Sequence, residues 1–350
     1  MKTKRLTIAV GAALAASLLF AGCGASEGDT SSQRGGDSSA SQELPGIPAK
    51  PYQVTESRAE VTDNADGTRT VTSEWGSATV PAEPQRIVTI LGYVDFETML
   101  ALGVTPVGAG TQGGTVASGF APHLGELTDG IQPLDWSQGA PVEKIASLRP
   151  DLIFAPDKDS YNAVKDLAPT VPAGAADGRT WKDDARYVGA VLGLADQAEK
   201  LIADYETRAA ELKTELASAM AGKTVASPQV AYDHAQVYIA GANAFPSHVM
   251  QEVGLTLAPV LEGSDTHVEL SFENLTELDA DVLFWQVRQK DDNGSRDTAA
   301  LDVVEKSPLW SKLPAVQAGE VHHVDNRPWY FPTILSAEQM LTDIETALLD

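Results

Sequence analysis

The sequence predicts an α/β protein in which two related lobes are joined by a single long interdomain α-helix. Apolar strand patterns alternate with helical patterns along most of the chain, and one uninterrupted helical pattern lies near its middle. Two segments that precede this helix are repeated, in the same order, after it. Because each half carries a similar succession of elements, we expect two similar units with largely parallel sheets.

The composition of the chain limits the classes of molecule that it is expected to bind. The chain has 350 residues, of which 43% are hydrophobic, and a formal net charge of −24. This length allows two domains with sizeable apolar cores. The strong negative charge argues against nucleic acid or an anionic membrane surface as a partner, because the protein surface would repel both. An anionic ligand would need a local pocket of cationic or aromatic side chains.

The first residues have the pattern of a targeting segment. Three cations within the first five residues precede the apolar run Leu6–Phe20, which is too short for a typical membrane span. Phe20-Ala21-Gly22-Cys23 follows, and Cys23 is the only cysteine of the chain. The pattern is similar to a bacterial lipobox, with Phe20 in place of the usual leucine. We therefore expect a signal peptide at residues 1–22 and a lipidated, palmitate-bearing Cys23 on the outer face of the cell membrane. An ordinary signal peptide followed by an unmodified cysteine is the alternative.

Two short segments separate this anchor from the predicted lobes. Residues 23–54 are rich in Ser, Gly, Asp and Pro, a composition typical of a flexible tether and of Gram-positive-type cell surfaces. Residues 55–82 alternate polar and apolar side chains around Asn64-Ala65-Asp66-Gly67, which predicts a β-hairpin extension.

The N-terminal α/β lobe is predicted over residues 83–196. Arg86–Leu91 and Asp151–Ala155 have the apolar composition of buried strands. Asp95–Leu102 has helical periodicity, and Gly103 is suited to terminate that helix.

The interdomain helix is predicted over residues 197–222. Its apolar residues recur three and four positions apart: Ala198, Leu201, Ile202, Tyr205, Ala209, Leu212, Leu216 and Met220. From Gln197 to Met220 the helix would span about 36 Å, the width of a lobe. We interpret it as a strut between the lobes; an ordinary packing helix is the alternative.

The C-terminal α/β lobe is predicted over residues 223–350 because two segments of the first half recur there. Val142–Phe154 aligns without gaps onto Phe272–Phe284, with Glu, Leu, Asp and Phe identical at four positions. Met99–Thr105 similarly matches Met250–Thr256. The repeats imply two related lobes.

The order of several segments resembles a known family. PQRIVTIL, ETMLALGVTPVG, PVEKIASLRPDLIFA and LAPTV precede the long helix, and LSFENLTELDADVLF, SPLWSKLPAVQAGEVHHVD and a terminal WY follow it. From Pro81 onward the chain resembles the helical-backbone (class III) solute-binding proteins of ABC importers for ferric siderophores, haem and cobalamin. The resemblance implies two Rossmann-like lobes, a ligand cleft between them, and a rigid helix that limits closure to small motions. It implies a binding protein for iron uptake, not an enzyme, with an ABC permease dimer and its ATPase as partners. We expect a monomer by default, because one body must present two unlike lobes to its transporter.

The resemblance places one permease-docking glutamate on each lobe, at Glu143 and Glu273. In the sequence these residues follow Pro141 and Ser271 closely, so each carboxylate is expected in the first turn of a short helix, where the helix dipole favours its ionised form. A matched pair of carboxylates suits arginine pockets on a permease dimer. The alternative is that both are ordinary carboxylates at helix N-termini.

Ligand-binding candidates are cationic and aromatic residues expected in loops at strand ends. Arg288 follows the predicted strand Val282–Trp285, where the resemblance implies an arginine in catecholate binders; a solvated surface arginine is the alternative. Trp329 and Tyr330 occupy the family's C-terminal aromatic position and could stack on a flat chelate or simply pack. The weaker candidates are Tyr93, Trp136, Lys158, Tyr232, His234, Tyr238 and Arg327.

Two departures from the family affect the expected ligand. Residues 155–159 contain Lys158 as their only cation where many ferric-siderophore binders have an arginine, and residues 241–245 lack the arginine of catecholate binders. A pocket with few cations favours a hydroxamate or mixed ferric siderophore over a triscatecholate. Haem and cobalamin are the alternatives, because the family cleft accepts all three on one scaffold.

Metal-site and enzyme motifs give little support to other functions. None of the six histidines has the spacing of paired metal ligands, so we expect the siderophore to hold the iron and the protein to carry no cofactor. The sequence has no G-x-S-x-G, P-loop, H-E-x-x-H or Rossmann glycine fingerprint in a suitable context. A hydrolase without a recognisable motif and a purely structural surface protein are the alternatives from other classes.

Overall fold

The computed structural model describes residues 59–111, 119–137, 139–173, 180–231, 236–288 and 298–349. The predicted signal peptide, the predicted tether and Cys23 therefore lie outside the described residues, as do Tyr232 and His234. In the described part of the chain, no helix is both long enough and apolar enough to cross a membrane.

A small antiparallel sheet comes first. Its strands, in the order β1-β2-β3, are β1 (Ala59–Asp63), β2 (Arg69–Ser73) and β3 (Gly76–Val80). The predicted turn connects β1 to β2, and Gly67 adopts the positive φ of 84° that such a turn needs. The hairpin continues into a third strand that the sequence analysis did not predict. Arg69 attaches this sheet to the following lobe, because its guanidinium donates hydrogen bonds to the carbonyl oxygens of Val191, Pro81 and Ala82.

The N-lobe, which we define as residues 87–192, contains a five-stranded parallel sheet with the strand order β6-β5-β4-β7-β8. The strands are β4 (Ile87–Thr89), β5 (Gly108–Gly110), β6 (Gln132–Leu134), β7 (Leu152–Ala155) and β8 (Thr170–Pro172). The helices are α1 (Val94–Ala101), η1 (Pro122–Thr128), α2 (Val142–Ser147), α3 (Lys158–Val164) and α4 (Trp181–Leu192). Every residue of β4 and β7 is buried, as expected for parallel strands that are covered on both faces. The predictions of both strands and of the first helix are confirmed.

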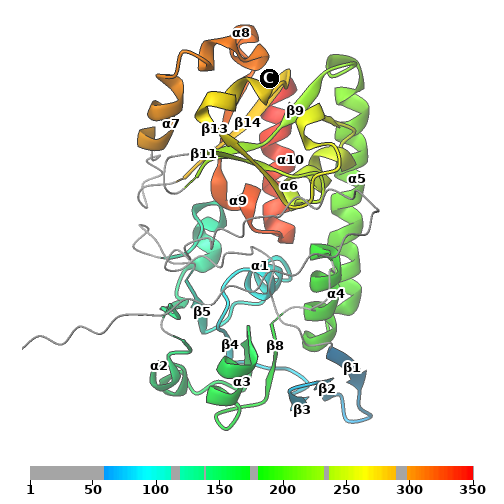
Figure 1. Ribbon diagram of the computed structural model, residues 1–350. Coiled ribbons are helices and arrows are strands. Elements are labelled where there is room, and N and C mark those ends of the chain that lie inside the picture. Colours follow the sequence, from blue (N-terminus) through cyan, green and yellow to red (C-terminus); the bar gives the residue numbers. More distant parts are fainter. Residues whose placement is uncertain are drawn as a thin grey trace, which may run out of the picture. The chain divides into compact units, whose positions relative to one another are not determined.

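The long helix α5 (Ala195–Ala219) follows α4 after a tight turn and runs beside elements of both lobes (Figure 1). Gly193 in this turn has a left-handed φ of 74°, and a Cβ there would lie 2.5 Å from the Arg69 guanidinium. Glycine is therefore required both by the backbone conformation and by the packing. The buried residues of α5 belong to the predicted apolar face: Ala198, Ile202, Tyr205, Ala209, Leu212 and Leu216.

The C-lobe, residues 224–349, combines two sheets. The parallel sheet has the order β12-β9-β14-β15, with β9 (Thr224–Ala226), β12 (Thr256–Leu257), β14 (Val282–Val287) and β15 (Val321–Asp325). The antiparallel sheet contains β10 (Pro228–Val230), β11 (Gln236–Ala240) and β13 (His267–Ser271). The helices are α6 (Phe245–Glu252), η2 (Pro259–Leu261), η3 (Phe272–Glu277), α7 (Thr298–Glu305), η4 (Trp310–Lys312), α8 (Pro314–Ala318), α9 (Asn326–Tyr330) and α10 (Ile334–Leu349). The predicted α/β architecture of two lobes joined by a long helix is confirmed, and the antiparallel sheet distinguishes the C-lobe from the N-lobe.

The internal repeats correspond to equivalent structures. Helices α1 and α6 both end just before a glycine with positive φ, 75° at Gly103 and 79° at Gly254. After each glycine, the next amide reaches back into the last helical turn: Val104 N donates to Met99 O at 2.8 Å, and Leu255 N donates to Met250 O at 3.0 Å. The matched segments thus form the same helix-terminating motif.

Candidate functional site

Most predicted ligand-binding residues follow the carboxyl ends of parallel strands. In the N-lobe, Tyr93 comes after β4, Trp136 after β6 and Lys158 after β7. In the C-lobe, Arg288 follows β14, while Arg327 and Tyr330 belong to α9, directly after β15. Ligands of open parallel sheets bind at this edge, so the topology places these side chains where a site is expected.

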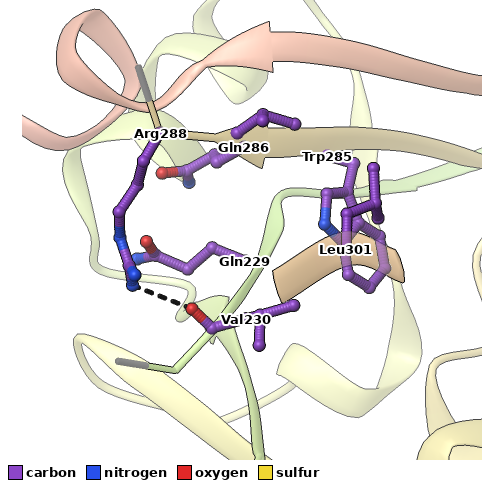
Figure 2. A pocket seen from close by; sticks show the side chains of 7 residues that line it. Gln229, Val230, Trp285, Gln286, Arg288 and Leu301 are labelled. Carbon is purple, nitrogen blue, oxygen red and sulfur yellow. Dashed lines mark hydrogen bonds between the residues drawn. The ribbon is translucent and has the colours of Figure 1, made fainter. Parts of the chain in front are cut away.

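A recess lies at the ends of β10 and β14 (Figure 2). It is lined by Gln229, Val230, Trp285, Gln286, Val287, Arg288 and Leu301. Arg288 is half-buried, and its Nη2 donates a hydrogen bond of 2.9 Å to the carbonyl oxygen of Val230. Arg288 is therefore partly shielded from solvent, while its contact with a ligand stays a prediction. Among the described residues predicted to bind ligand, Arg288 alone lines this recess.

A network of neutral amides, which was not predicted from the sequence, supports the recess. The Nδ2 group of Asn326 donates to Gln229 Oε1 at 2.9 Å and to Gln286 Oε1 at 3.0 Å. Gln286 Nε2 in turn donates to Ser227 Oγ at 2.9 Å. Because Gln286 and Asn326 are buried, these bonds fix the orientation of the glutamine beside Arg288. The amide side chains at the strand ends could have been noticed in the sequence. Their pairing could not, because it joins residues that are far apart in the chain.

Aromatic side chains from both lobes meet around Phe331, a residue that was not among the predicted site residues. The ring centroids of Tyr93 and Phe331 are 4.9 Å apart, and those of Tyr330 and Phe331 are 5.1 Å apart. Burial, reinforced by the nearby Asp95 carboxylate, raises the pKa of Tyr93 well above its usual range. Tyr93 therefore remains a neutral phenol and takes part in packing between the lobes.

A buried polar contact also joins the lobes. Glu97 in α1 is fully buried, and its Oε2 atom accepts hydrogen bonds from the hydroxyl groups of Thr333 and Ser336, at the N-terminus of α10. His123 Nε2 lies 3.5 Å from the same carboxylate oxygen. The Glu97 side chain of the N-lobe thus lies at the N-terminal end of a C-lobe helix, where a negative charge is favoured.

Trp329 requires a correction. Its side chain is fully buried, its ring stacks on Phe284 with centroids 4.9 Å apart, and its Nε1 donates to Asp343 Oδ2 at 2.7 Å. The predicted stacking of Trp329 on a chelate is therefore wrong, and the packing alternative is correct. An indole with a buried hydrogen-bond partner is a typical core residue.

The remaining candidates have separate environments. Trp136 is half-buried, and its Nε1 donates to the carbonyl oxygen of Thr111 at 3.1 Å. Lys158 is exposed at the first position of α3. Tyr238 lies within the antiparallel strand β11, with its ring centroid 5.8 Å from that of His267. Their proposed contacts with a ligand stay predictions.

Glu143 and Glu273 have the local positions that the sequence predicts. Glu143 is exposed in the first turn of α2, whose N-cap is Pro141. Glu273 is exposed in the first turn of η3, which is a 3₁₀ helix with Ser271 at its N-cap. Both carboxylates are accessible to a partner, while docking itself stays a prediction. Within the described residues, no group of three or more His, Cys, Asp or Glu side chains is arranged to hold a metal ion.

Known proteins resemble the chain over most of its length. The family model described as periplasmic binding protein matches residues 88–328. The chain is 30% identical to the probable siderophore-binding lipoprotein YfiY of Bacillus subtilis (strain 168), over 84% of the chain and 92% of that protein. It is 26% identical to the iron(3+)-hydroxamate-binding protein FhuD of the same organism, over 84% of the chain and 91% of that protein. The siderophore periplasmic binding protein from the fuscachelin gene cluster of Thermobifida fusca has a TM-score of 0.60 at 26% identity, covering 77% of the chain and 98% of that structure.

Proposed function

The chain belongs to the periplasmic binding protein family, and from this membership we propose that it is the extracytoplasmic solute-binding component of an ABC importer for a ferric siderophore. As a member of this family it is a binding protein and not an enzyme. The observation that carries the proposal is the half-buried Arg288, which sits beside buried amides at the carboxyl ends of β10 and β14. Relatives named for siderophore or ferric-hydroxamate binding support the choice of solute.

The solute is a hydroxamate or mixed ferric siderophore. The recess offers one guanidinium together with the neutral side chains of Gln229 and Gln286. A guanidinium donates charge-assisted hydrogen bonds to the anionic oxygens around Fe(III), whereas neutral amides suit a complex with little net charge. A triscatecholate, which carries several negative charges, would require more cations. The siderophore itself supplies the iron ligands, so the metal is cargo and not a cofactor.

Other parts of the chain serve the delivery of the ferric siderophore to the permease. Lipidation of Cys23 anchors the protein on the outer face of the cell membrane, and residues 24–54 provide the reach of a flexible tether. The exposed carboxylates of Glu143 and Glu273, one on each lobe, pair with arginines of the permease dimer that the ATPase drives.

Ligand identity is tested by native mass spectrometry and tryptophan fluorescence with a panel of ferric hydroxamates, mixed chelates, ferric catecholates, haem and cobalamin. We expect a one-to-one complex with a ferric hydroxamate or mixed chelate and quenching of the tryptophan emission, because Trp285 lines the recess. Quenching by ferric catecholates alone would overturn the chelate type, and binding of haem or cobalamin alone would overturn the siderophore assignment.

A further inference from the structure

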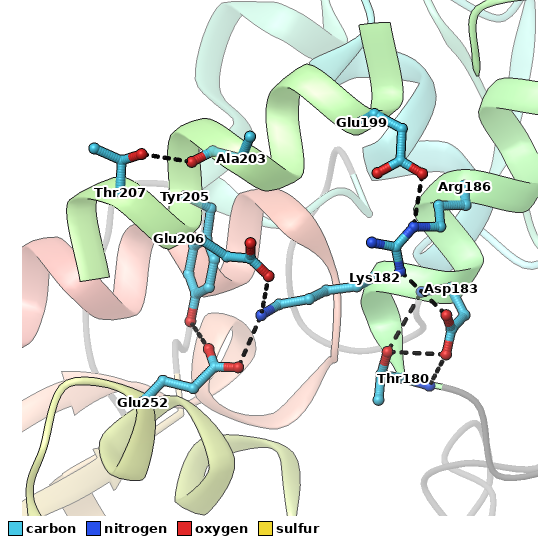
Figure 3. Close-up of polar contacts among 10 residues, drawn as sticks. All are labelled: Thr180, Lys182, Asp183, Arg186, Glu199, Ala203, Tyr205, Glu206, Thr207 and Glu252. Atoms are coloured by element: carbon cyan, nitrogen blue, oxygen red, sulfur yellow. Dashed lines mark hydrogen bonds and ion pairs between the residues drawn. The ribbon is translucent and has the colours of Figure 1, made fainter. Parts of the chain in front are cut away.

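Lys182 links helices of the N-lobe, the strut and the C-lobe. It lies in the first turn of α4, and its Nζ is 2.8 Å from Glu252 Oε1 in α6 and 3.1 Å from Glu206 Oε1 in α5 (Figure 3). The ammonium group also lies over two aromatic rings, 5.4 Å from the centroid of Trp181 and 5.2 Å from that of Tyr205. Three helices therefore meet at one cation.

The surroundings make this contact stronger than an ordinary surface ion pair. The Lys182 side chain is 15% exposed, and those of its partners Glu252 and Glu206 are 37% and 56% exposed. In the Lys200–Asp204 pair on α5, the side chains are 73% and 60% exposed. Tyr205 donates a hydrogen bond of 2.6 Å to the second carboxylate oxygen, Oε2, of Glu252. The Glu252 carboxylate is thus held at both oxygens, and a partly desolvated pair with this geometry is less screened than an exposed one.

Removal of the Lys182 cation would replace the local electrostatic attraction by repulsion. Without Lys182, the carboxylates of Glu206 and Glu252 would face each other across the space that its ammonium group now occupies. Two nearby carboxylates repel each other, so α6 would be pushed away from α5.

The position of Lys182 relative to Glu97 gives the contact a mechanical role. Glu97 in α1 bonds to Thr333 and Ser336 of the C-lobe, and α1 packs against α4. The N-lobe therefore contacts the C-lobe at two places, through Glu97 of α1 and through Lys182 of α4, and these two helices pack against each other. One attachment would permit rotation of one lobe about it, and a second attachment elsewhere restricts that rotation.

We propose that Lys182 is a positioning residue that, through Glu252 and Glu206, sets the angle between the lobes and thereby the position of the N-lobe relative to the Arg288 recess of the C-lobe. The effect on ligand affinity rests on the function proposed above, whereas the effect on the lobe angle does not. If the competent fraction of molecules falls, apparent affinity falls in proportion.

The experiment measures the lobe angle and ligand binding separately. The full chain carries Cys23→Ser, and dyes are attached at Ala163→Cys in the N-lobe and Ala318→Cys in the C-lobe, two exposed positions. Single-molecule energy transfer is compared for the unsubstituted background, Lys182→Gln, Lys182→Arg and Glu252→Gln. Lys200→Gln is the matched control, because it removes the same charge from an ion pair that lies within α5 alone. Affinity for a ferric hydroxamate is then measured by fluorescence.

We expect Lys182→Gln and Glu252→Gln to broaden or shift the energy-transfer distribution without ligand, and Lys182→Arg and Lys200→Gln to leave it unchanged. The dissociation constant should rise about three- to tenfold for the first two variants, as expected for a reduced competent fraction. If Lys182→Gln is too unstable to study, Glu252→Gln tests the same contact from the other lobe. Unchanged distributions in a folded Lys182→Gln or Glu252→Gln variant would overturn the proposal. A changed distribution in a protein that binds no member of the panel would retain the positioning role and reject the proposed function.

Discussion

Asp151 and Asp281 accept a matching backbone hydrogen bond at equivalent positions of the two lobes. Asp151 directly precedes β7, and its Oδ1 accepts from the backbone amide of Arg86 at 2.8 Å, next to the start of β4. Asp281 directly precedes β14, and its Oδ2 accepts from the backbone amide of Thr224, the first residue of β9, at 2.8 Å. Each aspartate fastens the amino ends of two adjacent parallel strands. The identity of these residues in the internal repeat therefore has a structural cause.

Substitution of Asp281 by alanine should destabilise the protein by about 1–3 kcal/mol, because partly buried donors of Thr224 lose their acceptor. Asp281→Asn, which keeps one carbonyl oxygen, should lose less. Urea unfolding measures the difference, with Asp279→Ala as the control because Asp279 is exposed. Equal stability of the Asp281→Ala and Asp279→Ala variants would show that the bond contributes nothing.

Local patterns predict the elements of this fold better than the contacts between them. The apolar face of α5 and the glycine that terminates α1 follow from spacing and backbone conformation, so they were predicted from sequence. For α6, the sequence showed only that Met250–Thr256 repeats Met99–Thr105. The third strand, β3, was missed because the turn at Glu74-Trp75 interrupts an otherwise continuous alternation. Such a turn leaves little trace in the spacing of apolar residues.

The candidate site was predicted only in part for a related reason. Arg288 was found because it follows a recognisable strand, whereas the role of Trp329 depends on Phe284 and Asp343. The bonds of Asn326 to Gln229 and Gln286 span long sequence separations. Periodicity carries no information about such pairings, because they arise only when the sheet has formed.

The proposed docking to a permease gives Glu143 and Glu273 matched roles. Each of Glu143→Gln and Glu273→Gln should reduce siderophore-dependent iron uptake about tenfold, since an Arg–carboxylate pair loses its charge assistance. Ligand affinity should not change, because neither residue lines the recess. Uptake of radioactive ferric chelate by cells and binding by purified protein measure the two effects.

Glu277→Gln provides the control for these variants, because Glu277 is an exposed carboxylate in the same 3₁₀ helix as Glu273. The docking assignment fails if the Glu277 variant impairs uptake as much as the Glu273 variant, or if uptake by the double variant Glu143→Gln/Glu273→Gln is normal.

Arg288→Gln should weaken the binding of a ferric hydroxamate by about ten- to a hundredfold, because a hydrogen bond to a charged group contributes roughly 1.5–3 kcal/mol. Fluorescence titration measures the change. Lys312→Gln, which removes an exposed cation of the same lobe, is the control for the loss of overall charge. Equal affinities of the two variants for the ferric hydroxamate would show that Arg288 does not bind the ligand. Circular dichroism establishes that the variant keeps its fold, which matters because Arg288 also bonds to Val230.

Asp95 makes the stability of the N-lobe dependent on pH. Burial raises the pKa of this carboxyl from 3.8 to about 6, against the opposing effect of the hydrogen bond from Thr89. A raised pKa means that the folded protein prefers the protonated acid. The associated stability is therefore complete below pH 3.8, the unfolded value, and is lost as pH rises through about 6.

Asp95→Asn removes this ionisation and keeps an oxygen that can accept the Thr89 hydroxyl hydrogen. The variant should therefore be more stable than the unsubstituted protein at pH 8, by on the order of 1–3 kcal/mol, and the difference should shrink towards zero as pH falls to about 4. Urea unfolding across this pH range measures the difference, with Asp129→Asn as the exposed control. A constant difference between the Asp95→Asn variant and the unsubstituted protein at all pH values would contradict the assignment, because only a group that ionises at a different pH in the folded and unfolded states produces a pH-dependent difference.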